Sequence, residues 1–305
     1  SGAKDIRDSL LRLKVGSSLS IAELLRVSAL LRVALRASDY GKRDHEPGEE
    51  DDALDAMFRE LAPVVSLAKE IDRCILSEEE IADDASNGLR SVRRAMKTAA
   101  EKIRTQLNSL VVNSRTYLQD GVITMRNGRY CVPVKAEHKS NVPGMVHDQS
   151  SSGSTIFVEP LSVVKLNNEL RELEIREQKE IEAVLAALSN QTCDHLDELT
   201  LDLELIGELD FIFAKATLSR HYRGCEPRLN KDGIIRLKNA RHPLLDPHRV
   251  VPITLTLGEN FDLLIVTGPN TGGKTVSLKT VGLLTLMGLA GLHVPAAEGT
   301  TPVSY

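Results

Sequence analysis

Residues 86–118 are the feature that most constrains the fold, because this stretch contains no proline and only one glycine, Gly88 near its start. Apolar residues recur in it at three- and four-residue spacing: Leu89, Val92, Met96, Ile103, Leu107, Leu110 and Val111. That period predicts a single amphipathic α-helix. At ~1.5 Å per residue the helix would be about 50 Å long.

A second long helix is predicted after Pro160, which suits a first helical position. Apolar residues then recur through a Glu-rich segment: Val163, Leu166, Leu170, Leu173, Ile181, Val184 and Leu188. Between the two helices lie four β-like segments, 122–125, 130–135, 144–147 and 155–158. Asn127-Gly128 between the first two is a strong hairpin signal. We therefore expect a projecting arm of two antiparallel helices with a small antiparallel meander as its tip.

Shorter helices are predicted before and after this arm. Ser20 and Glu23 form a capping box for a helix over 20–38, and a second helix covers about 53–75. Ser77 and Glu80 predict another capping box before a short helical turn. Residues 41–52, with an acidic run, lack an apolar period and predict an exposed loop. A helix near 193–221 returns the chain from the arm.

Charge is segregated along the chain, whose net charge is -5. Residues 86–147 hold 11 Lys and Arg against three acids, a net charge of +8, whereas 160–215 hold five against 13, a net charge of -8. The two helices could simply complement one another, as in a coiled coil. The tip could instead contact phosphates. Its candidates lie at or beyond the helix ends, where the acidic helix cannot easily neutralise them: Arg126, Arg129, Lys135 and Lys139.

A phosphate-binding loop is predicted near the C-terminal end. Residues 250–257 and 263–266 have strand character, and the second run is continuously apolar, as in a buried parallel strand. A Gly-x-x-x-x-Gly-Lys-Thr motif follows directly and opens a helix. The candidate ATP-binding residues are Gly268, Pro269, Asn270, Thr271, Gly272, Gly273, Lys274 and Thr275. The glycines allow main-chain N–H groups to converge on phosphates, Lys274 supplies a point charge, and the Thr275 hydroxyl would bind Mg²⁺.

The remaining candidate motifs give weaker evidence for a functional site. Phe157-Val158-Glu159 resembles a mismatch-probing wedge, but its place at a strand end favours a structural role. Arg241-His242-Pro243 could approach a nucleotide or be structural, and Asp246 and His248 have no nucleophile for a hydrolase triad. The four cysteines are widely spaced, which suggests neither a zinc site nor disulfides. With no apolar run of ~20 residues, we expect a cytoplasmic protein that does not enter membranes.

Several motifs together resemble the MutS ATPases. They are the phosphate loop, the downstream Gly-Leu-His-Val-Pro-Ala of 291–296 and the upstream Ala-Arg-His-Pro-Leu-Leu of 240–245. Thr271, Thr275 and Val276, with His-Asp-Gln-Ser at 147–150 and Phe-Val-Glu-Pro at 157–160, are similar to the second MutS lineage, which is associated with recombination control rather than mismatch repair.

The resemblance implies a homodimeric ATPase, with ATP and Mg²⁺ as cofactors, that binds branched DNA and suppresses homologous recombination. It also implies lever helices with a nucleic-acid-binding β tip, and extends to a C-terminal nuclease domain in the parent protein and to action on stalled ribosomes and their RNA. The sequence departs from the MutS pattern after the phosphate loop. Only 30 residues follow Thr275, and they lack the acidic pair that would complete catalysis. We therefore expect a piece of a longer protein with no complete catalytic site.

The expected fold is mainly α with β, in three parts: a helical core over 1–85, lever helices over 86–221 with a β clamp tip at about 120–159, and the start of a P-loop α/β ATPase domain over 222–305. A competing hypothesis is a non-catalytic module for dimerisation or ribosome binding. Salt dependence separates the two, since nucleic-acid binding weakens steeply with salt and an apolar protein interface does not. An unrelated coiled-coil ATPase of the chromosome-maintenance type fits less well, because its arm would be far longer.

Overall fold

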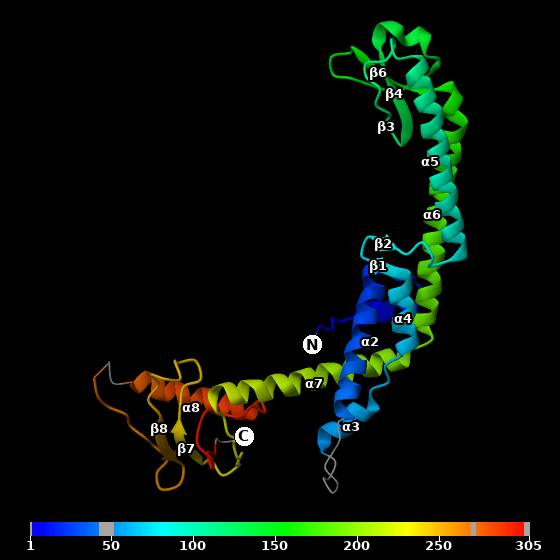
Figure 1. The fold of residues 1–305 in the computed structure, drawn as a ribbon. Helices are drawn as coiled ribbons and strands as arrows, with labels where there is room; N and C mark the ends of the chain where they lie inside the picture. The colour runs from blue at the N-terminus through cyan, green and yellow to red at the C-terminus, as the bar shows by residue number, and fades with distance from the viewer. Residues whose placement is uncertain (1, 43–51, 270–272, 302–305) are drawn as a thin grey trace. The chain divides into compact units, whose positions relative to one another are not determined.

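The structure is a computed structural model that describes residues 2–42, 52–269 and 273–301 (Figure 1). The chain divides into two compact units, Ser1–Leu203 and Glu204–Tyr305. Helix α7 (Leu196–Tyr222) begins in the first unit and ends in the second. None of the helices in the described part of the chain combines the length and the apolar character that crossing a membrane requires.

The first unit begins with four helices, α1 (Arg7–Lys14), α2 (Ile21–Gly41), α3 (Ala53–Glu60) and α4 (Val65–Cys74). The capping box of α2 is confirmed, because Ser20 Oγ accepts from Glu23 N and the Glu23 carboxylate accepts from Ser20 N. The single helix predicted over 53–75 is wrong: it is broken between α3 and α4, where Pro63 cannot donate a helical hydrogen bond.

The second predicted capping box is also wrong. Its residues form a small antiparallel pair, β1 (Ile75–Ser77) and β2 (Glu80–Ile81). The Ser77 hydroxyl accepts from the backbone N–H of Glu79 instead of capping a helix. A serine side chain that bonds two residues ahead favours a turn over a helix start.

Two long helices, α5 (Asn87–Asn113) and α6 (Leu161–Cys193), pack side by side and antiparallel (Figure 1). Their buried seam joins Val92, Ala99, Ile103 and Leu107 of α5 to Leu170 and Leu173 of α6. Ser86 caps α5 through Leu89 N. The helix ends five residues before the predicted Leu118, because the chain there turns to bond the sheet: Lys135 N donates to Tyr117 O and Gln119 N donates to Pro133 O.

The β tip is a four-stranded antiparallel sheet of β3 (Thr124–Arg126), β4 (Arg129–Lys135), β5 (Gly144–Gln149) and β6 (Thr155–Pro160). Asn127 and Gly128 form the predicted hairpin turn with positive φ angles of 50° and 74°. The meander is wrong, because the order is β3-β4-β6-β5. The 3₁₀ helix η1 (Ala136–Asn141) carries the chain past β6. The more apolar β6 thereby takes the buried centre and the exposed β5 takes the edge.

The second unit contains an antiparallel pair, β7 (Ile235–Ala240) and β8 (Ile253–Leu257), and helix α8 (Lys274–Leu289). Its core is formed by residues of α7, β7, α8 and the segment that follows α8: Tyr222, Leu237, Ala240, Leu284, Met287, Val294 and Ala296. The buried parallel strand predicted over 263–266 is wrong, since Leu263 is 75% exposed and Ile265 74%. A parallel strand needs neighbours on its edges and cover on both faces, and no described strand pairs with this run.

A buried carboxyl ties α7 to the break between α3 and α4. Asp202 is fully buried, and its Oδ1 accepts a 2.8 Å hydrogen bond from the backbone N–H of Ala62. Its Oδ2 has no hydrogen-bond partner among the described residues. Burial, with the charge of Glu198 as a smaller cause, raises the pKa of Asp202 above its usual 3.8, against the lowering effect of the Ala62 bond.

We expect Asp202→Asn to be more stable relative to wild type at pH 7 than at pH 4. A carboxyl whose pKa is raised on folding contributes most below its unfolded pKa of 3.8 and loses that contribution as pH rises toward the folded value. Asn keeps the acceptor for Ala62 and does not titrate. Urea unfolding of both proteins at the two pH values measures the difference, and a pH-independent difference would contradict a raised pKa. Asp202→Ala, which removes the acceptor, should cost about 1–3 kcal/mol.

Candidate functional site

The candidate anion site is the N-terminus of α8. Gly268 has φ of 139° and Gly273 has φ of 79°, both in the region where side chains are strained. Gly273 is the N-cap of α8, and no side chain of the described residues caps this end. The first backbone N–H groups of a helix have no intrahelical acceptor, and the helix dipole makes them favourable for an anion. Asn270, Thr271 and Gly272 lie outside the described residues.

Lys274 closes the loop. Its ammonium group donates to the carbonyl oxygen of Gly268, so the first and seventh residues of the motif meet. Ser277 Oγ donates to Gly273 O one turn further on. The Thr275 side chain has no hydrogen-bond partner in the described part of the chain and is exposed. A cation, a hydroxyl and the first N–H groups of α8 are therefore gathered at one helix end, as triphosphate and Mg²⁺ binding requires.

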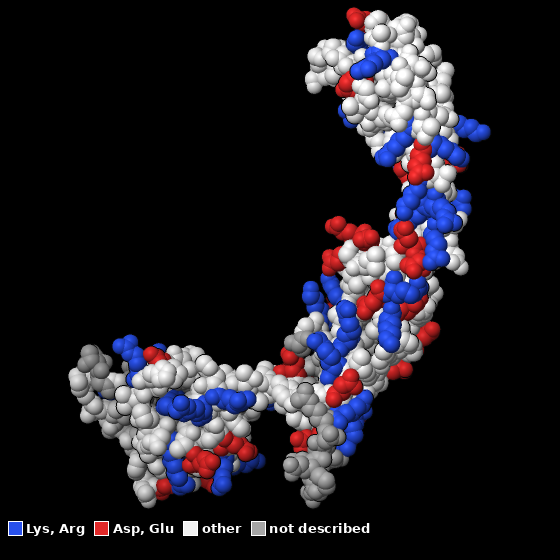
Figure 2. All heavy atoms as spheres, viewed as in Figure 1, with Lys and Arg blue, Asp and Glu red and all other residues white. Residues whose placement is uncertain are grey.

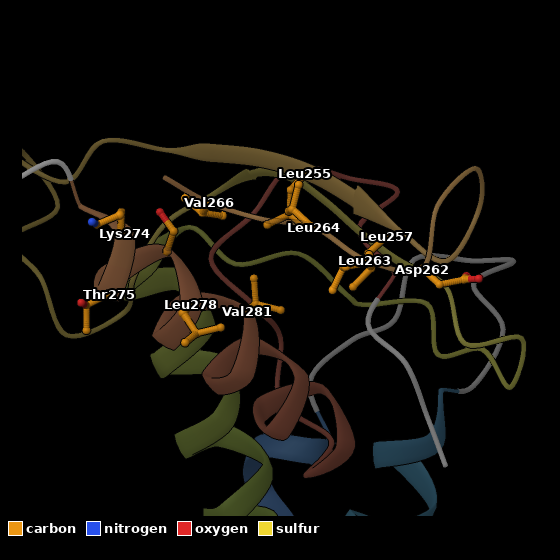
Figure 3. Close-up of a pocket in the computed structure, with 11 residues that line it drawn as sticks. Leu255, Leu257, Asp262, Leu263, Leu264, Val266, Lys274, Thr275, Leu278 and Val281 are labelled. Carbon is orange, nitrogen blue, oxygen red and sulfur yellow. The ribbon is translucent and has the colours of Figure 1, made fainter. Parts of the chain in front are cut away.

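A cavity of about 510 Å³ lies beside this helix end (Figure 3). Lys274 and Thr275 stand at one end of it, and Asp262 stands at the other (Figure 3). Its remaining walls are mostly apolar: Leu255, Leu257, Leu263, Leu264, Val266, Leu278 and Val281. Such walls suit apolar packing and not phosphate. The candidate anion site is thus confined to the start of α8, and Asp262 is not gathered with Thr275.

The upstream Arg-His-Pro motif has bonding partners within the second unit. The Arg241 guanidinium donates to the carbonyl oxygens of Tyr222 and Arg223 at 3.0 and 3.1 Å. His242 Nδ1 accepts from Leu244 N at 3.3 Å. The Arg241 bonds join the end of α7 to the segment after β7, and the His242 bond lies within that segment. The motif therefore has a structural role.

The four candidate cations of the tip have different surroundings. Arg126 lies 3.1 Å from the Asp148 carboxylate and 4.1 Å above the centre of the Phe157 ring. The Lys135 ammonium donates to the backbone carbonyl of Thr116 at 3.2 Å. Arg129 pairs with a buried glutamate, and Lys139 is exposed without an acidic partner among the described residues.

A buried polar cluster that the sequence did not predict surrounds Glu159. Its carboxylate is fully buried and accepts from Arg129 Nη1 at 2.7 Å and from Asn167 Nδ2 at 2.8 Å, while His147 Nε2 lies 2.6 Å from its other oxygen. Asn167 also accepts from the N–H and donates to the carbonyl of Tyr130. The cluster joins β4, β5 and β6 to the start of α6. Its members are 8 to 30 residues from Glu159, so no local pattern reveals it.

Burial alone would raise the pKa of Glu159. Hydrogen bonds from Asn167, His147 and Arg129 outweigh it and hold the pKa below its usual 4.5. The carboxylate is therefore ionised at neutral pH. The Arg129 charge is matched inside the protein before any ligand arrives.

Long paired helices that carry a small sheet, together with a helix that opens after a glycine in the left-handed conformation, make this a mixed α/β protein with a candidate anion site at one helix end. No family model matches the chain. It is 57% identical over 299 residues to Endonuclease MutS2 of Agathobacter rectalis, a match that covers 97% of this chain and 38% of that protein.

The same name is carried by relatives from Lachnospira eligens, 56% identical over 300 residues, and Lachnoclostridium phytofermentans, 54% identical over 306. Each match covers 98% of this chain, and 37% and 38% of the relative. The chain belongs to the MutS2 family. It spans less than two fifths of the length of the curated relatives that it matches.

Proposed function

We propose that the start of α8 binds the phosphates of ATP in the parent protein. The observation that carries this proposal is the helix end at which Gly273 is in the left-handed conformation, Lys274 stands beside it, and no side chain of the described residues forms a cap. Bound Mg²⁺ would neutralise charge on the β- and γ-phosphates, with the Thr275 hydroxyl as its ligand from this chain. The chain alone is expected to hydrolyse ATP poorly, since Asp262, the one acid among the described residues that line the cavity, stands at the end opposite Thr275 (Figure 3).

We further propose that the helical arm contacts nucleic acid, with branched DNA as the partner. The net charge of +8 over 86–147 supports this, because phosphates dominate the affinity of such complexes. The relatives are named endonucleases, which supports a nuclease activity outside this chain. By the same kinship the parent protein would act as a cytoplasmic homodimer that suppresses recombination, with residues 1–85, 86–221 and 222–305 as core, lever and ATPase parts.

The test uses the full-length protein. Fluorescent ATP titrations should show binding that requires Mg²⁺ for full affinity. Binding to a four-way DNA junction, to linear duplex and to ribosomes should be measured at several salt concentrations, with and without ATP. Affinity for a junction that falls steeply with salt supports the proposal. Salt-insensitive self-association with no affinity for nucleic acid would favour the dimerisation module instead.

A further inference from the structure

One solvent face of α5 carries a row of basic side chains. Arg90, Arg94, Lys97 and Arg104, here called the α5 basic row, are all exposed. They stand four, three and seven residues apart, which keeps them on one helix face, opposite to the seam with α6. The row is about 21 Å long at ~1.5 Å per residue. Figure 2 shows Lys and Arg gathered along the paired long helices.

Acidic neighbours neutralise this row only in part. Arg90 lies 3.7 Å from Asp84, and Lys97 lies 3.4 Å from Asp83. All four side chains of these two pairs are more than half exposed, so the pairs are weak. Among the described residues, Arg94 and Arg104 have no acidic partner.

The acidic helix does not neutralise the row either. Glu101 is the only acid that falls within the row. In the described part of the chain a single ion pair joins α5 to α6, between Arg93 and Glu177 at 2.7 Å. Arg93 is only 20% exposed and lies outside the row. The complementary charges of the two helices therefore leave the outer face of α5 cationic.

Two of the four tip cations, Arg126 and Arg129, are less available to an external anion than Arg94 and Arg104 of this row. Arg126 is matched by Asp148, and Arg129 is matched by the buried Glu159. An added phosphate would have to compete with carboxylates already held at 3.1 and 2.7 Å. Arg94 and Arg104 face no such competition.

The surroundings of the row indicate the kind of anion. Thr98, Thr105 and Ser109 lie beside it, and each hydroxyl donates to the helix carbonyl four residues earlier. Within the described residues, Val112 is the one large apolar side chain exposed on α5. Protein interfaces have apolar and aromatic centres, and single-stranded nucleic acids are bound by stacking on aromatic side chains. A rigid cationic face without either fits the phosphate backbone of a duplex.

We infer that the α5 basic row binds the phosphate backbone of a nucleic-acid duplex without recognising its bases, and that it supplies more of the affinity than the tip cations do. This inference rests on the proposed nucleic-acid contact of the arm. It assigns the main cationic surface of that contact to the α5 basic row instead of the β tip. DNA and RNA duplexes share this phosphate chemistry, and the experiment below separates them.

The test compares three variants of the full-length protein. The row variant is Arg94→Gln/Lys97→Gln/Arg104→Gln, in which glutamine preserves helix propensity. The matched control is Lys165→Gln/Arg176→Gln/Lys179→Gln, which removes the same charge from exposed positions of α6. The third is Arg126→Gln/Lys135→Gln/Lys139→Gln in the tip, which leaves Arg129 and the Glu159 cluster intact. Circular dichroism and urea unfolding verify that each is folded.

Each protein is titrated with a 30-base-pair DNA duplex, the same duplex in RNA, and a single strand of equal length, from 50 to 200 mM salt. The row variant should bind duplex at least about tenfold more weakly. Its plot of log affinity against log salt should be shallower by about 2 to 3, near 0.9 for each phosphate that the variant no longer neutralises. The α6 control should stay within about twofold of wild type. A larger loss for DNA than RNA, or the reverse, identifies the natural duplex.

Two different failures are distinguishable. If wild type binds duplex and the row variant matches it in affinity and salt slope, or if the tip variant loses more than the row variant, the inference is wrong while the proposed function stands. If folded wild type binds no nucleic acid at 50 mM salt, the proposed function fails and the inference fails with it.

Discussion

Replacement of Glu159 by glutamine should destabilise the β tip by about 2–4 kcal/mol. Removing one charge of a buried pair costs roughly 3–5 kcal/mol, because the other charge is left unmatched. The lower range applies because the Arg129 side chain keeps 26% of its surface in water. Arg129, Asn167 and His147 all donate to this carboxylate. The amide N–H₂ of a glutamine would face one of these donors and leave it without an acceptor.

Hydrogen exchange of the β4 and β6 amides is the decisive measurement for Glu159→Gln, because a tip that opens locally need not change global unfolding. Asp148→Asn is the matched control: it removes a half-exposed carboxylate from Arg126 and should cost less than ~1 kcal/mol. Equal exchange in Glu159→Gln and wild type would contradict the role assigned to the cluster.

The pH dependence of Glu159→Gln gives a second check. Since the folded pKa of Glu159 lies below its usual 4.5, its contribution is fully present above the unfolded pKa and is lost as pH falls through the folded value. The difference between wild type and Glu159→Gln should therefore be constant near neutral pH and shrink below about pH 4.5. This sign is opposite to that expected for Asp202.

Local features of the fold were predictable from the sequence. Ser20 caps α2, and the Asn127-Gly128 turn joins β3 to β4, because each depends on residues within a few positions. The long helices followed from their apolar period. Ser77 shows the limit: the same Ser-x-x-Glu spacing stands in a strand turn, because cross-strand bonds between Ile75 and Ile81 override it.

Features set by distant contacts were not predictable. The place of β6 between β4 and β5 depends on which strand has the more apolar faces to bury, not on chain order. At the candidate site, the sequence predicted that glycines would allow an unusual backbone before Lys274, and Gly273 has a φ of 79°. The pairing of Arg129 with Glu159, 30 residues away, carried no sequence signal. Charge counting therefore could not show that Arg126 and Arg129 have acidic partners whereas Arg94 and Arg104 have none among the described residues.

Lys274→Ala should weaken ATP binding by about 10- to 100-fold. A hydrogen bond to a charged group contributes about 1.5–3 kcal/mol, and 1.4 kcal/mol corresponds to a factor of ten in affinity. The ammonium group now donates to Gly268 O at the exposed loop, where water can replace it. The substitution should therefore leave the second unit folded, and the decrease in affinity can be assigned to the phosphate contact.

Lys279→Ala is the matched control for Lys274→Ala, since Lys279 is exposed on the same helix one turn beyond the loop. Titration with a fluorescent ATP analogue measures both, and ATP-induced stabilisation against urea gives an independent readout that scales with ligand concentration over Kd. Lys279→Ala should bind as wild type does. Equal affinity in Lys274→Ala and Lys279→Ala would show that the start of α8 is not where the phosphates bind, because Lys274 is the one cation among the described residues that line the cavity there.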